Sequence, residues 1–146
     1  QSSRQQKSTA TQQIIVMHVV PDGDKLFTGK QIVAAMKKIG LFYGKMKIFH
    51  RVVDVDGKKE PIFGVANMVE PGVFEAAELE KLRSPGLTFF LQLPGPIRGV
   101  DAFDRMVSDA NALKKELDGI VLNDQREPMN QAWVDVLRVK LISEAA

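Results

Sequence analysis

The chain has no cysteine among its 146 residues. This absence excludes disulfide bridges, thiolate zinc ligands and cysteine nucleophiles, and it suits a reducing compartment. The sequence also lacks any apolar run near the roughly 18 residues that a membrane-spanning helix needs. Because the chain begins with Gln1 and not with Met, we expect it to be an excised fragment, so that a membrane anchor or targeting segment could precede it.

Net charge is nearly absent as well. The formal charge is +2, and residues 1–11 account for it, because they contain Arg4 and Lys7 and no acid. The rest of the chain has 18 basic and 18 acidic side chains, which gives no support to a nucleic-acid or membrane-surface function. Residues 1–11 are rich in Gln, Ser and Thr, a composition typical of flexible linkers. We therefore predict a linker remnant over residues 1–11 and one binding domain over residues 12–146.

Patterns for catalysis and for metal binding are missing too. The two histidines, His18 and His50, lie in predicted strands, and neither has a neighbour at a spacing suited to orient it or to share a metal. Asp54-Val55-Asp56-Gly57 begins like a calcium loop, but the twelfth position, which needs a glutamate, is Val65. There is also no glycine-rich phosphate loop and no nucleophile elbow. We predict no enzyme, no cofactor and no metal site.

What the sequence does contain is a mixture of strand and helix patterns, with 45% hydrophobic and 26% charged residues, as in one soluble globular domain. Predicted strands cover residues 12–20, 44–53, 61–69, 87–93 and 120–122. One helix is predicted after a capping box at Thr28 and Gln31, and two more cover residues 74–82 and 100–118. A last helix is predicted after a cap at Asn130. Hairpins mixed with helices favour an α+β fold with a largely antiparallel sheet and helices on one face.

The strands carry more apolar residues than such a one-sided sheet requires. The core for the helices is supplied by Val19, Phe63, Val65, Phe89, Leu91 and Leu93. The opposite alternation is apolar as well, with Ile14, Val16, Met46, Ile48, Ala66, Met68 and Phe90. Methionine suits surfaces that adapt to a partner, and a contiguous exposed apolar patch usually marks an interaction site. Periodicity alone leaves two alternatives open, namely that helices cover both faces or that the chain dimerises through this sheet.

Several motifs on these strands carry a family resemblance. They are GKMKIFHR at residues 44–51, FGVANMVEPG at residues 63–72, SPGLTFFLQ at residues 84–92 and GIVLNDQR at residues 119–126. From about Gln13 to the end, in one order and without a large insertion, the chain resembles the family of C-terminal FtsZ-binding domains of the bacterial division protein ZipA.

The resemblance implies a six-stranded, mostly antiparallel sheet with three helices on one face and a shallow apolar groove on the other. The groove would bind the C-terminal tail of FtsZ, and the domain would tether FtsZ polymers during septum formation. The groove residues implied are Ile14, Met46, Ile48, Ala66, Met68, Thr88 and Phe90, with Arg126 at the rim, and strand alternation adds Val16. The resemblance also implies an N-terminal anchor in the inner membrane at the septum, with this domain on the cytoplasmic side, and we expect a monomer.

Two charges depart from the family pattern. Lys45 stands where the pattern has an acid, and Glu70 where it has a lysine, which could retune attraction at the rim without changing the apolar centre. Two other functions remain as alternatives. An RNA-binding sheet would need two or three stacking aromatics and a basic surround, and this face has one Phe. A ferredoxin-like small-molecule regulatory domain would show a glycine-rich loop, and residues 21–27 contain one glycine.

Overall fold

The computed structural model describes residues 12–145, so the linker predicted for residues 1–11 lies outside the described residues, as does Ala146. The main strands are β1 (Gln13–Pro21), β4 (Phe49–Val55), β5 (Lys58–Asn67), β7 (Leu87–Leu93) and β8 (Gly119–Leu122). Short strands are β2 (Phe27–Thr28), β3 (Phe42–Tyr43) and β6 (Arg83–Ser84). The helices are α2 (Gly29–Ile39), α3 (Gly99–Leu117) and α4 (Gln131–Ala145), and η1 (Lys45–Lys47) and η2 (Ala76–Glu78) are single 3₁₀ turns.

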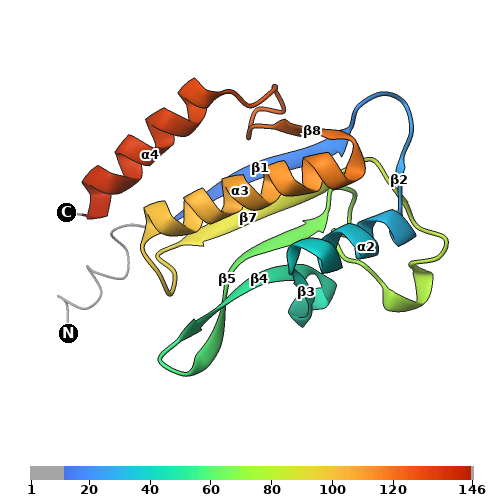
Figure 1. The fold of residues 1–146 in the computed structure, drawn as a ribbon, viewed down its shortest axis with the longest axis horizontal. Coiled ribbons are helices and arrows are strands. Elements are labelled where there is room, and N and C mark those ends of the chain that lie inside the picture. The colour runs from blue at the N-terminus through green and yellow to red at the C-terminus, as the bar shows by residue number, and fades with distance from the viewer. Residues whose placement is uncertain (1–11, 146) are drawn as a thin grey trace.

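The central sheet has six strands in the order β3-β4-β5-β7-β1-β8, and every pairing in it is antiparallel. The short strands β2 and β6 pair separately. Within residues 12–145 there are three α-helices, and Figure 1 shows α3 lying across β1 and β7. The predicted α+β class and its antiparallel sheet are confirmed.

The core lies between the helices and one face of the sheet. All six of the strand residues predicted to form this core are buried: Val19, Phe63, Val65, Phe89, Leu91 and Leu93. Helix α3 buries a complementary apolar face against them, with Phe103, Met106, Ala110 and Leu113 at 0% exposure. Because the buried strand residues follow a period of two, the alternate side chains must point to the opposite face of the sheet.

Local signals fix the ends of the helices. Thr28 and Gln31 form the predicted capping box: the Gln31 amide donates to Thr28 Oγ1 at 3.1 Å, and the Thr28 amide donates to Gln31 Oε1 at 2.9 Å. Gly40 ends α2 at φ 87°, a left-handed conformation that glycine adopts without a steric penalty. The Trp133 amide donates to Asn130 Oδ1 at 2.9 Å, so the predicted cap of the last helix is confirmed.

One predicted strand is wrong in its first part, and one predicted helix is wrong. The strand predicted over residues 44–53 begins only at Phe49, because Met46 and Lys47 adopt left-handed φ values of 62° and 60° in η1. Tertiary contacts hold this turn: the Phe74 amide donates to the Lys47 carbonyl at 2.8 Å, and His50 Nε2 lies 2.9 Å from the Lys45 carbonyl. The helix predicted over residues 74–82 is only the turn η2. In the first of these segments such contacts outweigh local propensity.

None of the described helices combines the length and the hydropathy that crossing a bilayer requires.

Candidate functional site: the uncovered face of the sheet

The face of the sheet opposite to α3 is built from side chains of β5, β7 and β1 that stand in cross-strand rows. In one row Gly64 pairs with Phe90, and Phe90 pairs with Val16. In the next row Ala66 pairs with Thr88, which pairs with His18. Cross-strand neighbours on one face lie about 4.5–5.5 Å apart, so these side chains form a continuous surface.

Two glycines form the floor of this surface, and larger side chains lie over them. A methyl group placed on Gly64 would come within 2.6 Å of Phe90 Cζ and 2.9 Å of Ile48 Cδ1. Phe90 and Ile48 therefore meet above Gly64, although Phe90 belongs to β7 and Ile48 lies between η1 and β4. In the same way, a methyl group on Gly86 would lie 2.9 Å from Val20 Cγ1 and 3.0 Å from Met68 Sδ. The side chains gather where the backbone has no Cβ to keep them apart.

We call the eight predicted groove residues other than Arg126 the sheet-face patch: Ile14, Val16, Met46, Ile48, Ala66, Met68, Thr88 and Phe90. Their exposure differs widely. Met46 is 77% exposed and Ile14 is 62% exposed, whereas Ile48 is only 4% exposed, because it packs beside Phe90. The other five are half-buried. The structure thus brings Val16, Ile48, Ala66, Thr88 and Phe90 together, with Met68 over Gly86, Ile14 at one end and Met46 in the turn η1.

His18 lies within the same face and was not among the predicted groove residues. It is 6% exposed, and its Nδ1 lies 2.9 Å from Thr88 Oγ1. Burial lowers the pKa of His18 from 6.5, the positive charge of Arg126 lowers it further, and Asp124 acts in the opposite direction. The neutral imidazole is therefore favoured. His18 pairs with Leu122 of β8, so the loop that follows β8 and carries Asp124 and Arg126 begins beside this row of the sheet.

The loop that carries Arg126 is held by Asn123, which is 8% exposed. Its Oδ1 accepts from the Gln125 amide at 2.8 Å and from the Glu127 amide at 3.1 Å, while its own amide donates to the Glu127 carbonyl at 2.7 Å. Arg126 has a φ of 62° at the tip of this turn and is exposed. A single buried side chain thus fixes the backbone from which the predicted rim cation projects.

Sequence reasoning missed several residues of this face, among them His18, Val20, Gly64 and Gly86. His18 alternates with Ile14 and Val16 along β1, so that signal was available. Val20 continues the same alternation. The two glycines gave no side-chain signal, and only the tertiary structure shows that Phe90 and Met68 lie over them.

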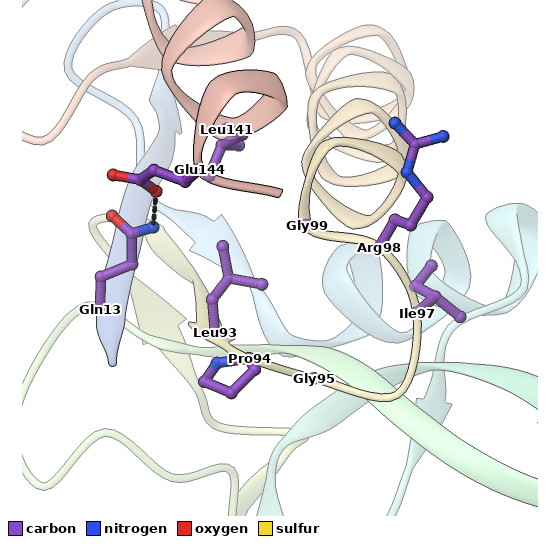
Figure 2. Close-up of a pocket in the computed structure, with 9 residues that line it drawn as sticks. All are labelled: Gln13, Leu93, Pro94, Gly95, Ile97, Arg98, Gly99, Leu141 and Glu144. Carbon is purple, nitrogen blue, oxygen red and sulfur yellow. Dashed lines mark hydrogen bonds between the residues drawn. The ribbon is translucent and has the colours of Figure 1, made fainter. Parts of the chain in front are cut away.

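A hollow lies where β7 leads into α3 and where α4 ends. Figure 2 shows it, with a hydrogen bond of 2.9 Å between Gln13 Nε2 and Glu144 Oε1 at one side. Its volume is about 220 Å³, and it contains none of the predicted groove residues. Leu93 and Leu141, both buried core residues, form part of its wall. We interpret it as a packing gap between the helix ends.

Across residues 12–145 no three His, Asp or Glu side chains are grouped so as to hold a metal ion. The chemistry that the sheet face offers is mainly apolar contact, with polar side chains at Thr88, His18, His50 and Gln92 and in the loop that carries Arg126. Such a surface can bind an extended or helical apolar segment.

Comparison with known proteins identifies the family of the chain. Residues 13–140 match the family described as "ZipA, C-terminal FtsZ-binding domain". A cell division protein ZipA of Xanthomonas euvesicatoria pv. vesicatoria is 33% identical over 128 residues, which are 88% of this chain and 53% of that protein. The ZipA protein of Pseudomonas syringae pv. tomato is 35% identical over 131 residues, which are 90% of this chain and 46% of that protein.

The ZipA protein of Stutzerimonas stutzeri is 32% identical over 142 residues, which are 97% of this chain and 52% of that protein. The chain thus spans about half the length of the ZipA proteins that it matches. The family match covers most of the chain, and the chain belongs to the family of ZipA C-terminal FtsZ-binding domains.

Proposed function

We propose that this chain binds the C-terminal tail of FtsZ on the sheet-face patch and acts in cell division as a tether for FtsZ polymers. One observation supports the site most directly: one face of the sheet is packed against α3, while the other carries a row of apolar side chains centred on Phe90. A member of an FtsZ-binding family therefore has an apolar surface that its own helices leave open. The function is binding, without catalysis and without a cofactor.

The shape of the surface suggests a weak contact. Ile48 is buried, and five of the eight patch residues are half-buried, so a bound peptide removes a modest apolar area from water. Ordering a flexible tail consumes part of the gain, so we expect a Kd on the order of micromolar. FtsZ polymers that present many tails to many copies of the domain would recover strength through avidity.

The rest of the proposal concerns the longer protein to which this domain belongs. We propose that the protein is anchored in the bacterial inner membrane by an N-terminal segment and acts at the division septum, with this domain on the cytoplasmic side and residues 1–11 as part of a flexible linker. We also propose that the domain is monomeric. We further propose that no nucleic acid is involved, because residues 12–146 contain 18 basic and 18 acidic side chains and so offer no excess of positive charge.

The proposal is tested by titrating the chain with a fluorescent peptide of the FtsZ C-terminal tail and following the anisotropy. Phe90→Ala and Met68→Ala should each weaken binding by about 1–3 kcal/mol, as residues in the centre of an interface do. Both side chains are half-buried, so the folded state should survive, which circular dichroism checks.

Phe42→Ala is the matched control. Phe42 is also an aromatic residue, but it is 63% exposed on the edge strand β3 and lies outside the patch. It should leave tail binding unchanged. Equal affinities for the wild type, Phe90→Ala and Phe42→Ala would overturn the assignment of the tail to this face.

A further inference from the structure

The hairpin formed by β4 and β5 reaches beyond the rest of the sheet. β7 pairs with β5 only from Gly64 to Asn67, whereas β4 and β5 pair with each other from Phe49↔Val65 to Val55↔Lys58. The outer part of the hairpin, residues 52–61, is therefore a two-stranded ribbon, and Figure 1 shows it projecting from the body of the domain. An isolated ribbon has two edges that need protection from unwanted pairing.

The two edges of this ribbon differ in composition. The β5 edge carries Lys58, Lys59 and Glu60, and then Pro61, which has no N–H to donate. Charges and proline are the usual means of protecting an edge strand. The β4 edge runs Val52, Val53, Asp54, Val55 and has one charge. The β5 edge of the ribbon is thus protected from pairing with another strand, whereas the β4 edge is not.

The main chain of the β4 edge is available for pairing. β3 pairs only with Phe49 and His50, and among residues 12–145 no strand pairs with the outer side of Arg51–Val55. The Gly44 amide donates to the Ile48 carbonyl at 3.0 Å, so Ile48 points its main-chain groups toward the outer edge. Because alternate residues point the same way in a strand, Val52 and Asp54 also present their N–H and C=O groups there.

A hollow of about 450 Å³ lies beside this edge, on the side of the sheet that bears His50. Its apolar wall comes from Phe42, Val52 and Pro61. Two basic residues, Lys45 and Lys59, line it together with one acid, Asp54. Neither lysine forms an ion pair within residues 12–145, whereas Lys38, Lys47, Arg51, Arg105 and Arg138 do. The hollow thus has one more basic than acidic side chain; Asp54 stands opposite Lys59 in the pairing of β4 with β5, and Lys45 has no acid opposite it.

Two of the polar groups at the hollow already have partners. The Tyr43 hydroxyl donates to the Phe74 carbonyl, and His50 Nε2 lies 2.9 Å from the Lys45 carbonyl. The groups left to recognise a ligand are the strand edge, the apolar wall, the two ammonium groups and the Asp54 carboxylate.

We propose that the β4 edge from Val52 to Val55 is a second binding site, which accepts an extended segment of a partner protein by strand addition. Main-chain hydrogen bonds to Val52 and Asp54 align the segment, as in other edge-binding domains. A large apolar side chain enters the hollow at Phe42. Successive side chains on one face of a strand are two residues apart, so a carboxylate two positions away reaches Lys59 or Lys45. The motif is an apolar residue, any residue, then an acid.

This site borders the sheet-face patch but shares none of its residues: Lys45 adjoins Met46, and Phe42 stands in the cross-strand row of His50, Gly64 and Phe90. The probe is the acetylated and amidated pentapeptide Thr-Phe-Thr-Glu-Thr, titrated into the ¹⁵N-labelled chain and followed by heteronuclear NMR. The amides of Val52 and Asp54 should shift, whereas those of Thr88 and Phe90 should not. Lys59→Glu and Phe42→Ala should each weaken binding at least fivefold, and Phe90→Ala should leave it unchanged.

Three results would overturn the proposal. The first is a map of shifts centred on the patch, or no shifts at all up to millimolar peptide. The second is equal binding of the same peptide with lysine in place of glutamate. The third is movement of the Val52 and Asp54 amides with protein concentration in the absence of peptide, which would make a second copy of the chain the occupant. The outcome of the pentapeptide titration does not depend on the outcome of the tail titration. Phe90→Ala should weaken only tail binding, and Phe42→Ala should weaken only pentapeptide binding.

Discussion

The ring of Phe90 lies over Gly64, the residue directly opposite it on the neighbouring strand. Since a methyl group on Gly64 would lie 2.6 Å from Phe90 Cζ and 2.9 Å from Ile48 Cδ1, both side chains depend on the absence of that methyl group. The shape of the proposed tail site is thus set by a residue that offers no side chain to the ligand.

Gly64→Ala should therefore displace the Phe90 ring and weaken tail binding, although it adds apolar area to the surface. Overpacking of this kind costs about 1–3 kcal/mol of stability, which urea unfolding measures. The control is Gly95→Ala, because a methyl group there meets nothing closer than the Gln92 carbonyl at 3.5 Å. An unchanged tail affinity in Gly64→Ala would mean that the ring position above this glycine has no role in binding.

Met46→Gly should separate binding from stability. Met46 is 77% exposed and has a φ of 62°, so its side chain adds little to the core while its backbone adopts a conformation that glycine tolerates better. Relief of backbone strain and the greater freedom of an unfolded glycine oppose each other, and the free energy of unfolding should change by less than about 1 kcal/mol. Tail affinity should fall, because an adaptable side chain is lost.

The comparison for this variant is Lys47→Gly. Lys47 has a similar φ of 60°, but its ammonium group forms an ion pair with Glu75 at 3.0 Å. It should not change tail affinity. If both glycine variants reduce tail binding equally, the contribution comes from the shape of the turn and not from the thioether.

Strand alternation was sufficient to predict which face of β1 and β7 is buried, because β7 keeps a strict period of two and β1 departs from it between Ile14 and Val20 only at His18. It failed where the chain departs from that period. The segment containing Met46 alternates like a strand, yet it forms a turn that is held by Phe74 from a distant loop. A contact between residues so far apart in the sequence leaves no local pattern.

The same limit applies to the site. Ile48 was predicted to lie on the exposed face, and its side chain is on that face, but the packing above Gly64 buries it. The effect of Arg126 on the pKa of His18 was not predictable either, because it requires the Asn123 turn to bring the end of one strand beside the middle of another. Alternation gives the face of a residue, and only tertiary packing gives its exposure and its charged neighbours.

His18 should make the domain less stable in mild acid. Its pKa in the folded state is below the usual 6.5, so the unfolded state binds more protons between these two values. Stability is therefore fully present above pH 6.5, falls as the pH falls below 6.5, and levels off once the pH is below the folded-state pKa. Urea unfolding at a series of pH values measures this, and His18→Gln should remove the part of the slope that is due to this residue.

Two neighbours of His18 should shift its pKa in opposite directions. Arg126→Gln removes a positive charge that lowers the pKa, so the pKa should rise. Asp124→Asn removes a negative charge that raises it, so the pKa should fall. NMR titration of the imidazole measures both. Shifts of the same sign in the two variants would mean that the loop does not lie beside His18 as described.

A buried ion pair joins the opposite face of the sheet to the helices. Arg51 and Asp109 are 8% and 5% exposed, and two hydrogen bonds connect them, at 2.8 Å from Nε to Oδ2 and 3.0 Å from Nη2 to Oδ1. Arg51 also donates to the Ile39 carbonyl at 2.7 Å and to the Gly40 carbonyl at 3.2 Å, at the C-terminal end of α2. The guanidinium thus links β4, α2 and α3, and it lies where a helix end favours positive charge.

Asp109→Ala should lower the free energy of unfolding by about 3–5 kcal/mol, because it leaves a buried guanidinium without its carboxylate. The matched control is Asp104→Ala, which removes the more exposed pair between Asp104 and Arg138 and should cost about 1 kcal/mol or less. Both losses are read from urea unfolding. Arg51→Met combined with Asp109→Leu should cost less than Asp109→Ala alone, because no unpaired charge remains.

The ion pair lies on the helix side of the sheet, so the fraction of Asp109→Ala that remains folded should bind the FtsZ tail with the affinity of the wild type. Equal losses of stability in Asp109→Ala and Asp104→Ala would show that water reaches Arg51 and screens it. A loss of tail affinity in folded Asp109→Ala would show that the two faces of the sheet are coupled through β4, since Arg51 and the patch residue Ile48 lie three residues apart in that part of the chain.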